Sequence, residues 1–241
     1  MHRVKRTNLS APPTRAVVLA AGRGRRLIPY TNRTPKPLLP VAGRPVLDYV
    51  LTALAAAGVQ QVTLVVGYRS AQIRQYAGDG AAWKLALSYA RQEERLGTAH
   101  ALQQAAGFLS APSFVLAADY ALPPGYLAGL KAAYRAAGTP LAVSLKRLPA
   151  GELAARSSVR FDDAGRICAI VEKPPPGAAP STIGASLIYI VPPVIRRYLD
   201  HLARSSRGEY ELPAVVNRML ADGYAIAGLL QPAPPEWAPP E

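Results

Sequence analysis

Residues Ala16–Pro45 are A-V-V-L-A-A-G-R-G-R-R-L-I-P-Y-T-N-R-T-P-K-P-L-L-P-V-A-G-R-P. The stretch begins with an apolar run, Ala16–Ala21, that is typical of a buried strand, and the run ends abruptly in a loop rich in glycine and arginine. Glycines let the main chain approach a phosphate closely, and Arg and Lys side chains meet its charge. The stretch therefore predicts a buried strand followed by a phosphate-binding loop.

The loop fits neither of the two most common phosphate-binding motifs. A P-loop closes its glycine turn with Gly-Lys-Ser/Thr, whereas Gly24 is followed here by Arg25 and Arg26. A dinucleotide-binding fingerprint needs a third glycine at the position where this chain has Leu27. A different kind of phosphate site is therefore expected.

The segment from Leu19 to Leu38 resembles the signature of the sugar-1-phosphate nucleotidylyltransferases, L-A-A-G-x-G-S/T-R-L/M-x-P-x-T-x-x-x-P-K-P-L, with Arg25 in place of Ser or Thr. The resemblance implies that Arg26 clamps a nucleoside triphosphate and that Lys36 neutralises the reacting phosphates, both as catalytic residues. It implies a nucleotide-binding role for four residues of the strand end and loop, Leu19, Ala21, Gly22 and Gly24. The alternative is an arginine-rich surface loop in which Pro and Gly only form turns.

A second segment, Gln92–Ala99, is similar to the family's Q-x-x-x-x-G-T-A/G motif, in the form seen in members that use UTP or dTTP. The amide of Gln92 offers one acceptor and two donors, enough to pair with the N3–H and O4 of uracil or thymine. Gly97 would let the base lie against the backbone, and Thr98 would cap the following helix. The alternative is a plain loop with a helix cap, and uracil is not distinguished from thymine.

Asp119 ends the apolar run Ser113–Ala118 and matches the family's magnesium-binding aspartate. Mg²⁺ takes few protein carboxylates and completes its shell with phosphate oxygens and water, so one such residue could be enough. The resemblance therefore implies Mg²⁺ as the cofactor, with Asp119 as its ligand and as a catalytic residue. A strand-ending turn aspartate is the alternative.

Glu172 and Lys173 match the family's E-K-P segment, in which the Glu accepts sugar hydroxyls and the Lys meets the sugar phosphate. The next apolar strand resembles the family's A-S-M-G-I-Y type, and there Gly184 would leave room for the sugar beside Ser186. The resemblance implies that these four residues bind the sugar phosphate. An exposed ion pair and an ordinary core strand are the alternatives.

The match fails towards the end of the chain, where relatives carry a second metal-binding aspartate in a segment like W-x-D-x-G-T-P-E-D. No Asp follows Trp237, and Pro-Ala stands at 213–214 where the family has Thr-Asp. Asp119 would then act with water, or one of three glutamates would substitute: Glu209, Glu211 or Glu236. The chain would otherwise have lost turnover and kept only binding.

The rest of the chain predicts an α/β fold, with a Rossmann-like, doubly wound, mostly parallel sheet and a small β-hairpin insertion in the second half. Expected strands are Ala16–Ala21, Val62–Val66, Leu85–Tyr89, Ser113–Ala118, Leu141–Leu145 and Ser186–Val191, with a hairpin of Ser158–Asp162 and Arg166–Glu172. Expected helices are Val46–Ala57, Ala71–Tyr76, Thr98–Phe108, Tyr126–Ala137, Pro193–His201 and Tyr210–Ala221. Three parts are expected: a basic N-terminal extension at 1–15, the nucleotidyltransferase domain at 16–231 and a Pro-rich tail or wrapped extension at 232–241.

The composition predicts a soluble, cytoplasmic protein. The one cysteine, Cys168, excludes an intrachain disulfide, and no apolar run approaches the length of a membrane span. The formal net charge is +13, from 28 Lys and Arg against 15 Asp and Glu, and such an excess attracts polyanions. The cations are scattered rather than gathered in one basic stripe, so nucleic acid is not an expected partner, and neither is a membrane. The expected partners are a nucleoside triphosphate and a sugar-1-phosphate. A homo-oligomer is left open.

These features together predict a Mg²⁺-dependent nucleotidylyltransferase that makes a UDP- or dTDP-sugar and releases pyrophosphate, with the sugar left open. One alternative is a non-catalytic sugar-nucleotide-binding regulatory subunit, and another is a cytidylyltransferase for an alcohol phosphate, against which Gln92 and the Glu172-Lys173-Pro174 segment argue. A nucleic-acid-binding protein that uses the positive charge is a third.

Overall fold

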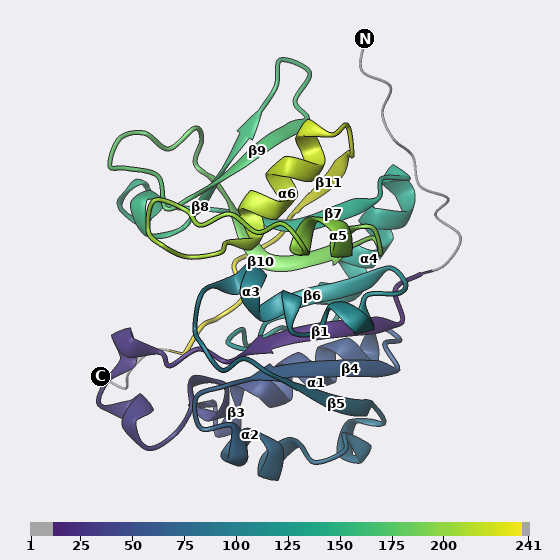
Figure 1. Ribbon diagram of the computed structural model, residues 1–241, viewed down its shortest axis with the longest axis vertical. Helices are drawn as coiled ribbons and strands as arrows, with labels where there is room; N and C mark the ends of the chain where they lie inside the picture. Colours follow the sequence, from purple (N-terminus) through teal and green to yellow (C-terminus); the bar gives the residue numbers. More distant parts are fainter. Residues whose placement is uncertain (1–11, 238–241) are drawn as a thin grey trace.

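The structure of the protein is a computed structural model that describes residues 12–237 (Figure 1). The main sheet contains β1 (Arg15–Ala20), β4 (Gln61–Val66), β5 (Ala86–Arg91), β6 (Ser113–Ala117), β7 (Leu141–Arg147), β8 (Ser157–Phe161), β9 (Ile167–Glu172), β10 (Ile183–Val191) and β11 (Ile226–Leu230). The α-helices are α1 (Val46–Ala56), α2 (Ser70–Ala77), α3 (Thr98–Gln103), α4 (Tyr126–Ala137), α5 (Ile195–Leu199) and α6 (Leu212–Ala221). A separate two-stranded hairpin pairs β2 (Pro40–Val41) with β3 (Arg44–Pro45).

The strand order is β11-β7-β10-β6-β1-β4-β5, and β8 pairs with β10 and β9 (Figure 1). The four strands β6, β1, β4 and β5 run parallel, with Ala16 opposite both Val62 and Phe114. Parallel strands end at the same edge of a sheet, so the loops that follow β1, β5 and β6 meet there. The predicted α/β, mostly parallel, doubly wound sheet is confirmed.

Both faces of the sheet are covered by helices, which explains the continuous apolar runs of the strands. Val18 faces a core that includes Leu51 of α1 and Leu130 of α4. Val17, one residue earlier, faces a second core that includes Leu102 of α3 and Val216 of α6. Successive side chains of a strand point to opposite faces, so β1 contributes to both cores.

Two parts of the sheet differ from the expected layout. β10 is antiparallel to both β6 and β7, and its register with β7 shifts between Ala185 and Tyr189. β11 was not predicted, because its short sequence is interrupted by Gly228. That glycine is needed where β11 lies against β7, since a Cβ there would lie 2.5 Å from Leu145 Cδ1.

The predicted helix over 98–108 is also wrong in its length: α3 ends at Gln103, and a 3₁₀ turn covers Ala106–Phe108.

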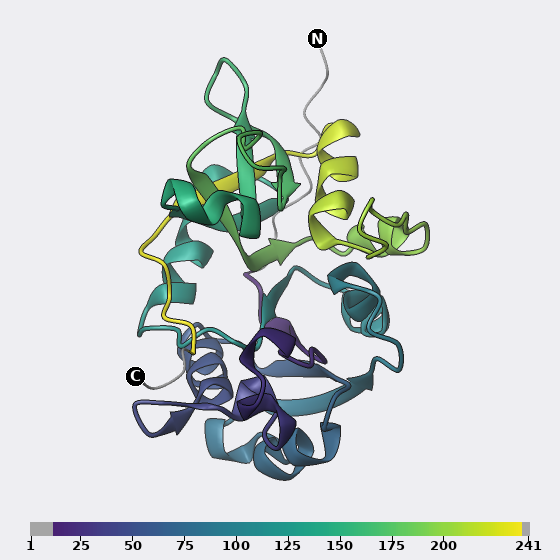
Figure 2. The same ribbon diagram turned by 90° about the vertical axis from the view of Figure 1, so that its left-hand side faces the viewer.

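The segment after β11 wraps across the molecule. In Figure 2 its yellow trace runs from the part that holds β9 and α6 to the part that holds α1 and the β2–β3 hairpin. Trp237 is 8% exposed and forms a small apolar cluster with Leu39 and Val46. Of the two predicted forms of this segment, tail or wrapped extension, residues 232–237 take the second, and 238–241 lie outside the described residues. Most of the predicted N-terminal extension, residues 1–11, also lies outside the described residues. The last residue of that predicted extension, Arg15, already belongs to β1.

None of the helices in residues 12–237 is both long and apolar enough to cross a membrane.

Candidate active site

A cleft lies at the carboxyl ends of the parallel strands, and it consists of two adjoining pockets. The first, named here the loop pocket, is lined by every residue predicted to bind the nucleotide: Leu19, Ala21, Gly22, Gly24, Gln92, Gly97 and Thr98. Three further arginines line the same pocket, namely Arg23, Arg25 and Arg95. Two carboxylates, Asp119 and Glu209, also line it, so the loop pocket carries a formal charge of +1, with three arginines available to a polyphosphate.

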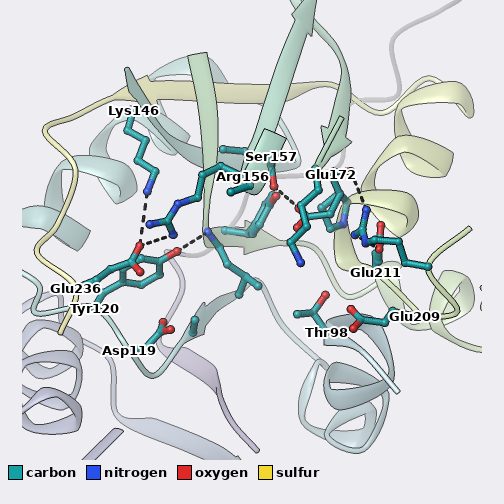
Figure 3. Close-up of a pocket in the computed structure, with 18 of the residues that line it drawn as sticks. Thr98, Asp119, Tyr120, Lys146, Arg156, Ser157, Glu172, Glu209, Glu211 and Glu236 are labelled. Carbon is teal, nitrogen blue, oxygen red and sulfur yellow. Dashed lines mark hydrogen bonds and ion pairs between the residues drawn. The ribbon is translucent and has the colours of Figure 1, made fainter. Parts of the chain in front are cut away.

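The second pocket, named here the hairpin pocket, lies beside the β8–β9 hairpin (Figure 3). Its lining includes five predicted site residues, Arg26, Thr98, Asp119, Glu172 and Lys173. The two pockets share the five residues Thr98, Ala117, Asp119, Leu187 and Glu209. One ligand in each pocket would therefore meet the other beside Asp119.

Lys36 lines neither pocket, but its ammonium Nζ lies 2.5 Å from Oδ2 of Asp119. Pro35 and Pro37 flank the lysine and restrict its backbone in a short 3₁₀ turn. Gly24 has φ +65°, and a Cβ there would lie 3.0 Å from Thr31 Cγ2. The hydroxyl of Thr31 also donates to the Gly24 carbonyl at 3.0 Å, so the loop folds back on itself and brings Lys36 to the end of β6.

Gln92 is 4% exposed and its amide is already oriented by the protein. The amide nitrogen lies 3.2 Å from the carbonyl of Gly97, to which it donates, and 3.0 Å from Nδ1 of His100. Its oxygen has no hydrogen-bond partner among residues 12–237. The side chain therefore presents an acceptor to the loop pocket, which suits the N3–H of a pyrimidine. Its amide nitrogen already contacts Gly97 and His100, so the predicted donation to O4 of the base competes with these contacts.

Gly97 and Thr98 join the two halves of the cleft. Gly97 has φ +117°, and a Cβ there would lie only 2.3 Å from the carbonyl oxygen of Tyr210. The prediction that Thr98 caps its own helix is wrong, because α3 begins at Thr98 after Gly97 without a side-chain cap. The hydroxyl instead accepts the N–H of Leu212 at 2.9 Å, where α6 begins. This contact couples the loop after β5 to the segment 209–212.

Asp119 offers one carboxylate to a metal ion, and no group of three or more His, Cys, Asp or Glu side chains in the described part of the chain could hold one. Two of the substitutes expected from the sequence have other partners, since Glu236 pairs with Arg156 and Glu211 pairs with Arg207. Asp119 is itself paired with Lys36, but through Oδ2 only. A Mg²⁺ ion bound mainly by phosphate oxygens and water, with the second carboxylate oxygen of Asp119 as its protein ligand, would fit this arrangement.

Glu209 is the third substitute expected from the sequence, and it differs from the other two. It lines both pockets, as Asp119 does, and its carboxylate has no ion-pair or hydrogen-bond partner in the range 12–237. Figure 3 places it beside Thr98, across the cleft from Asp119.

The wall formed by β9 and segment 207–211 carries alternating charges. Ser157 donates a short hydrogen bond to Glu172, and Arg207 pairs with Glu211. Arg207 also donates to the backbone carbonyl of Glu172 at 3.1 Å. Lys173 adopts a left-handed φ of +45°, a strained conformation for a residue other than glycine, and such strain often lies at functional sites. Sequence reasoning missed Arg207, although it stands two residues before the recognised segment that starts at Glu209.

The opposite wall carries a second charged cluster that sequence reasoning also missed in part. Arg156 Nη1 lies 2.7 Å from Glu236 Oε1, and Lys146 Nζ lies 3.8 Å from the same oxygen (Figure 3). Tyr120 is buried beside them and accepts the N–H of Leu187 at 3.2 Å. Burial, together with the nearby charge of Asp119, raises the pKa of the Tyr120 phenol well above its ordinary value, so this hydroxyl stays protonated. The sequence signal that could have identified this cluster is Lys146, a lysine that directly follows the apolar residues of β7.

Two predicted sugar-binding residues lie outside both pockets. Ala185, Leu187 and Tyr189 of β10 line the hairpin pocket, so Ser186, which is 1% exposed, points to the other face of the sheet. Gly184 allows close packing rather than ligand access, because a Cβ there would lie 2.4 Å from Leu148 Cδ1 and 2.9 Å from the Ser157 carbonyl oxygen. The structure thus does not bring either side-chain position into the cleft.

Comparisons with known proteins identify the family of the chain. The family model described as nucleotidyl transferase matches residues 15–233. The low-salt glycan biosynthesis nucleotidyltransferase of Haloferax volcanii is 30% identical over 214 residues, 88% of this chain and 58% of that protein. The glucose-1-phosphate thymidylyltransferase of Streptomyces antibioticus is 31% identical over 217 residues, 90% of this chain and 60% of that protein. The chain thus spans less than two thirds of the length of these curated relatives.

The fold is also that of a solved structure described as UDP-glucose pyrophosphorylase complexed with UDP-glucose. The two superpose with a TM-score of 0.80 at 21% identity, covering 90% of each chain. The likeness at this identity concerns the fold alone. The family match supports the resemblance first seen between Leu19 and Leu38: the chain belongs to the nucleotidyl transferase family.

Proposed function

We propose that the protein condenses a nucleoside triphosphate, UTP or dTTP, with a sugar-1-phosphate to give a nucleotide sugar and pyrophosphate. One observation carries the proposal: a cationic pocket lined by the signature loop and a second polar pocket adjoin at Asp119, which Lys36 contacts. The named activity of the Streptomyces antibioticus relative supports the same reaction.

In the proposed reaction, an oxygen of the sugar-1-phosphate attacks the α-phosphorus of the triphosphate. A new P–O bond forms there, the bond between the α-phosphorus and the bridging oxygen breaks, and pyrophosphate leaves with that electron pair. No protein nucleophile is required, so the protein contributes positioning and charge. A bound Mg²⁺, held by Asp119, would add positive charge at the phosphate oxygens.

The residues of the cleft have distinct roles in this proposal. Lys36, held at the junction by Asp119, neutralises charge that develops on the reacting phosphates. Arg26 lines the hairpin pocket and not the loop pocket, so it would stabilise the sugar phosphate or the leaving pyrophosphate from that side. The oxygen of Gln92 accepts a hydrogen bond from the N3–H of the base, which favours uracil or thymine over cytosine because cytosine has no hydrogen on N3.

A second candidate function rests on the missing carboxylate. Because Glu211 and Glu236 are paired with arginines, Glu209 is the one expected substitute left without a partner among residues 12–237, and it lies across the cleft from Asp119. If Glu209 does not complete the metal site, a protein that binds a sugar nucleotide without turnover is the competing proposal. We propose Mg²⁺ dependence and a cytoplasmic location with the enzymatic function.

Pyrophosphate release separates the two proposals. The protein is incubated with each nucleoside triphosphate and each of several hexose-1-phosphates, with Mg²⁺ and with EDTA, and Asp119→Asn serves as the blank. Release with UTP or dTTP and one sugar phosphate, abolished by EDTA, supports the enzyme. Triphosphate or nucleotide-sugar binding by calorimetry, without release from any pair, supports the binding protein instead.

A further inference from the structure

We propose that Glu236 recognises one hydroxyl group of the sugar: its free carboxylate oxygen accepts the hydroxyl hydrogen, and the Lys146 ammonium donates to the hydroxyl oxygen. This inference rests on the proposed function, because it names a contact of the sugar-1-phosphate in the hairpin pocket. It assigns a specificity role to the segment 232–237 that wraps across the cleft.

The backbone on both sides of Glu236 is held in place. Glu236 forms an antiparallel bridge with Tyr120, and the carbonyl of Pro235 accepts the N–H of Ala121 at 2.8 Å. Trp237 is anchored in its apolar cluster and also meets the ring of Tyr30 edge to face at 5.0 Å. The carboxylate is therefore preorganised, and little conformational entropy is lost when a ligand binds to it.

The two oxygens of Glu236 have different surroundings. Both neighbouring cations approach Oε1, at 2.7 Å from Arg156 and 3.8 Å from Lys146. No residue of the described range donates a hydrogen bond to Oε2. The residue lines the hairpin pocket and its side chain is 23% exposed there, so the second oxygen is available to a ligand in the cleft (Figure 3).

Lys146 is the complementary donor. Its side chain is only 6% exposed, yet its ammonium makes no hydrogen bond to any described residue, and its contact with Glu236 is longer than a hydrogen bond. A buried ammonium normally has its hydrogens paired. Burial and the neighbouring charge of Arg156 lower the pKa of Lys146, and the residue lines the hairpin pocket, where its ammonium can donate to a ligand.

The charges around this point select the chemistry of the ligand. A hydroxyl is both donor and acceptor, so it can satisfy Glu236 and Lys146 at once. A carboxylate in the same place could accept from Lys146 but could not donate to the free oxygen of Glu236, and an ammonium could donate to Glu236 but would be repelled by Lys146 and Arg156. A metal ion is disfavoured there for the same reason. The cluster therefore favours a neutral, hydroxyl-bearing sugar at this position.

The test is a double-mutant cycle between the protein and the sugar. Wild type and Glu236→Gln are assayed for pyrophosphate release with glucose-1-phosphate and with its analogues that lack one hydroxyl each, and calorimetry measures binding of the same compounds. Glu152→Gln is the matched control, because Glu152 also contacts Arg156, at 3.7 Å, but lies outside the cleft lining. Thermal unfolding checks that each variant is folded.

One analogue is expected to lose about 10- to 100-fold in kcat/KM with wild type and with Glu152→Gln, the range for a lost hydrogen bond to a charged group. With Glu236→Gln the same deoxygenation should cost only a few-fold, because the contact is already weakened. Equal costs in all three proteins, in turnover and in binding, would overturn the role of Glu236 while leaving the proposed function standing. A wild type that neither turns over nor binds any sugar phosphate would overturn both.

Discussion

Replacing Lys36 with methionine should separate catalysis from folding. The side chains of Lys36 and Asp119 are 17% and 28% exposed, and a partly exposed pair of this kind contributes about 1 kcal/mol or less to stability. Loss of a positive charge aimed at the reacting phosphates costs about 3 kcal/mol in the transition state, which is a hundredfold or more in turnover. Lys36→Met is therefore expected to fold almost as stably as wild type and to turn over at about 1% of its rate or less.

The assay combines pyrophosphate release at saturating substrates with urea unfolding of the same samples. Lys131→Met is the matched control, because Lys131 also has one polar partner, the carbonyl of Ala57 at 2.7 Å, but lies away from both pockets. The control should keep wild-type turnover. A Lys36→Met protein with turnover within twofold of wild type, or a loss of activity fully explained by unfolding, would refute the assignment of Lys36.

Three more substitutions test other parts of the cleft. Asp119→Asn should remove the response of activity to Mg²⁺, measured by a metal titration, and a normal response would mean that another residue binds the ion. Gly97→Ala should lower the free energy of unfolding by more than about 1 kcal/mol and weaken triphosphate binding, because its Cβ would lie 2.3 Å from the Tyr210 oxygen. Gly107→Ala is the control: no atom lies within 4 Å of the added Cβ, so neither stability nor binding should change. Trp237→Ala should cost about 3 kcal/mol in urea unfolding and weaken sugar phosphate binding by releasing Glu236; unchanged sugar affinity would contradict the link between them.

Local patterns were sufficient to predict three central strands in the first half of the protein. The expected strands over 16–21, 62–66 and 113–118 differ from β1, β4 and β6 by one residue at most at either end, because each is an apolar run bounded by glycine or polar residues. The residues predicted to bind the nucleotide lie along one pocket, since the loops after parallel strands meet at one edge.

Local patterns failed where a residue's role depends on distant neighbours. Ser186 belongs to a recognised segment, yet the face of β10 that it occupies is opposite to the cleft. Thr98 resembles a helix cap, yet its hydroxyl is taken by Leu212, which lies 114 positions further along the chain. In both cases the pairing of strands and the docking of α6 decided the outcome, and neither is encoded in a short window of sequence.

The sequence by itself determined the family, the mostly parallel sheet and the glycine- and arginine-rich loop after β1, because glycine, proline and apolar spacing act over a few residues. Only the tertiary structure decided which charges meet in the hairpin pocket. Arg156 and Glu236 are 80 positions apart, and they meet because β8 pairs with β10 while the segment after β11 returns across the cleft to Tyr120. Contacts of this kind depend on strand order and chain path, which long-range packing selects.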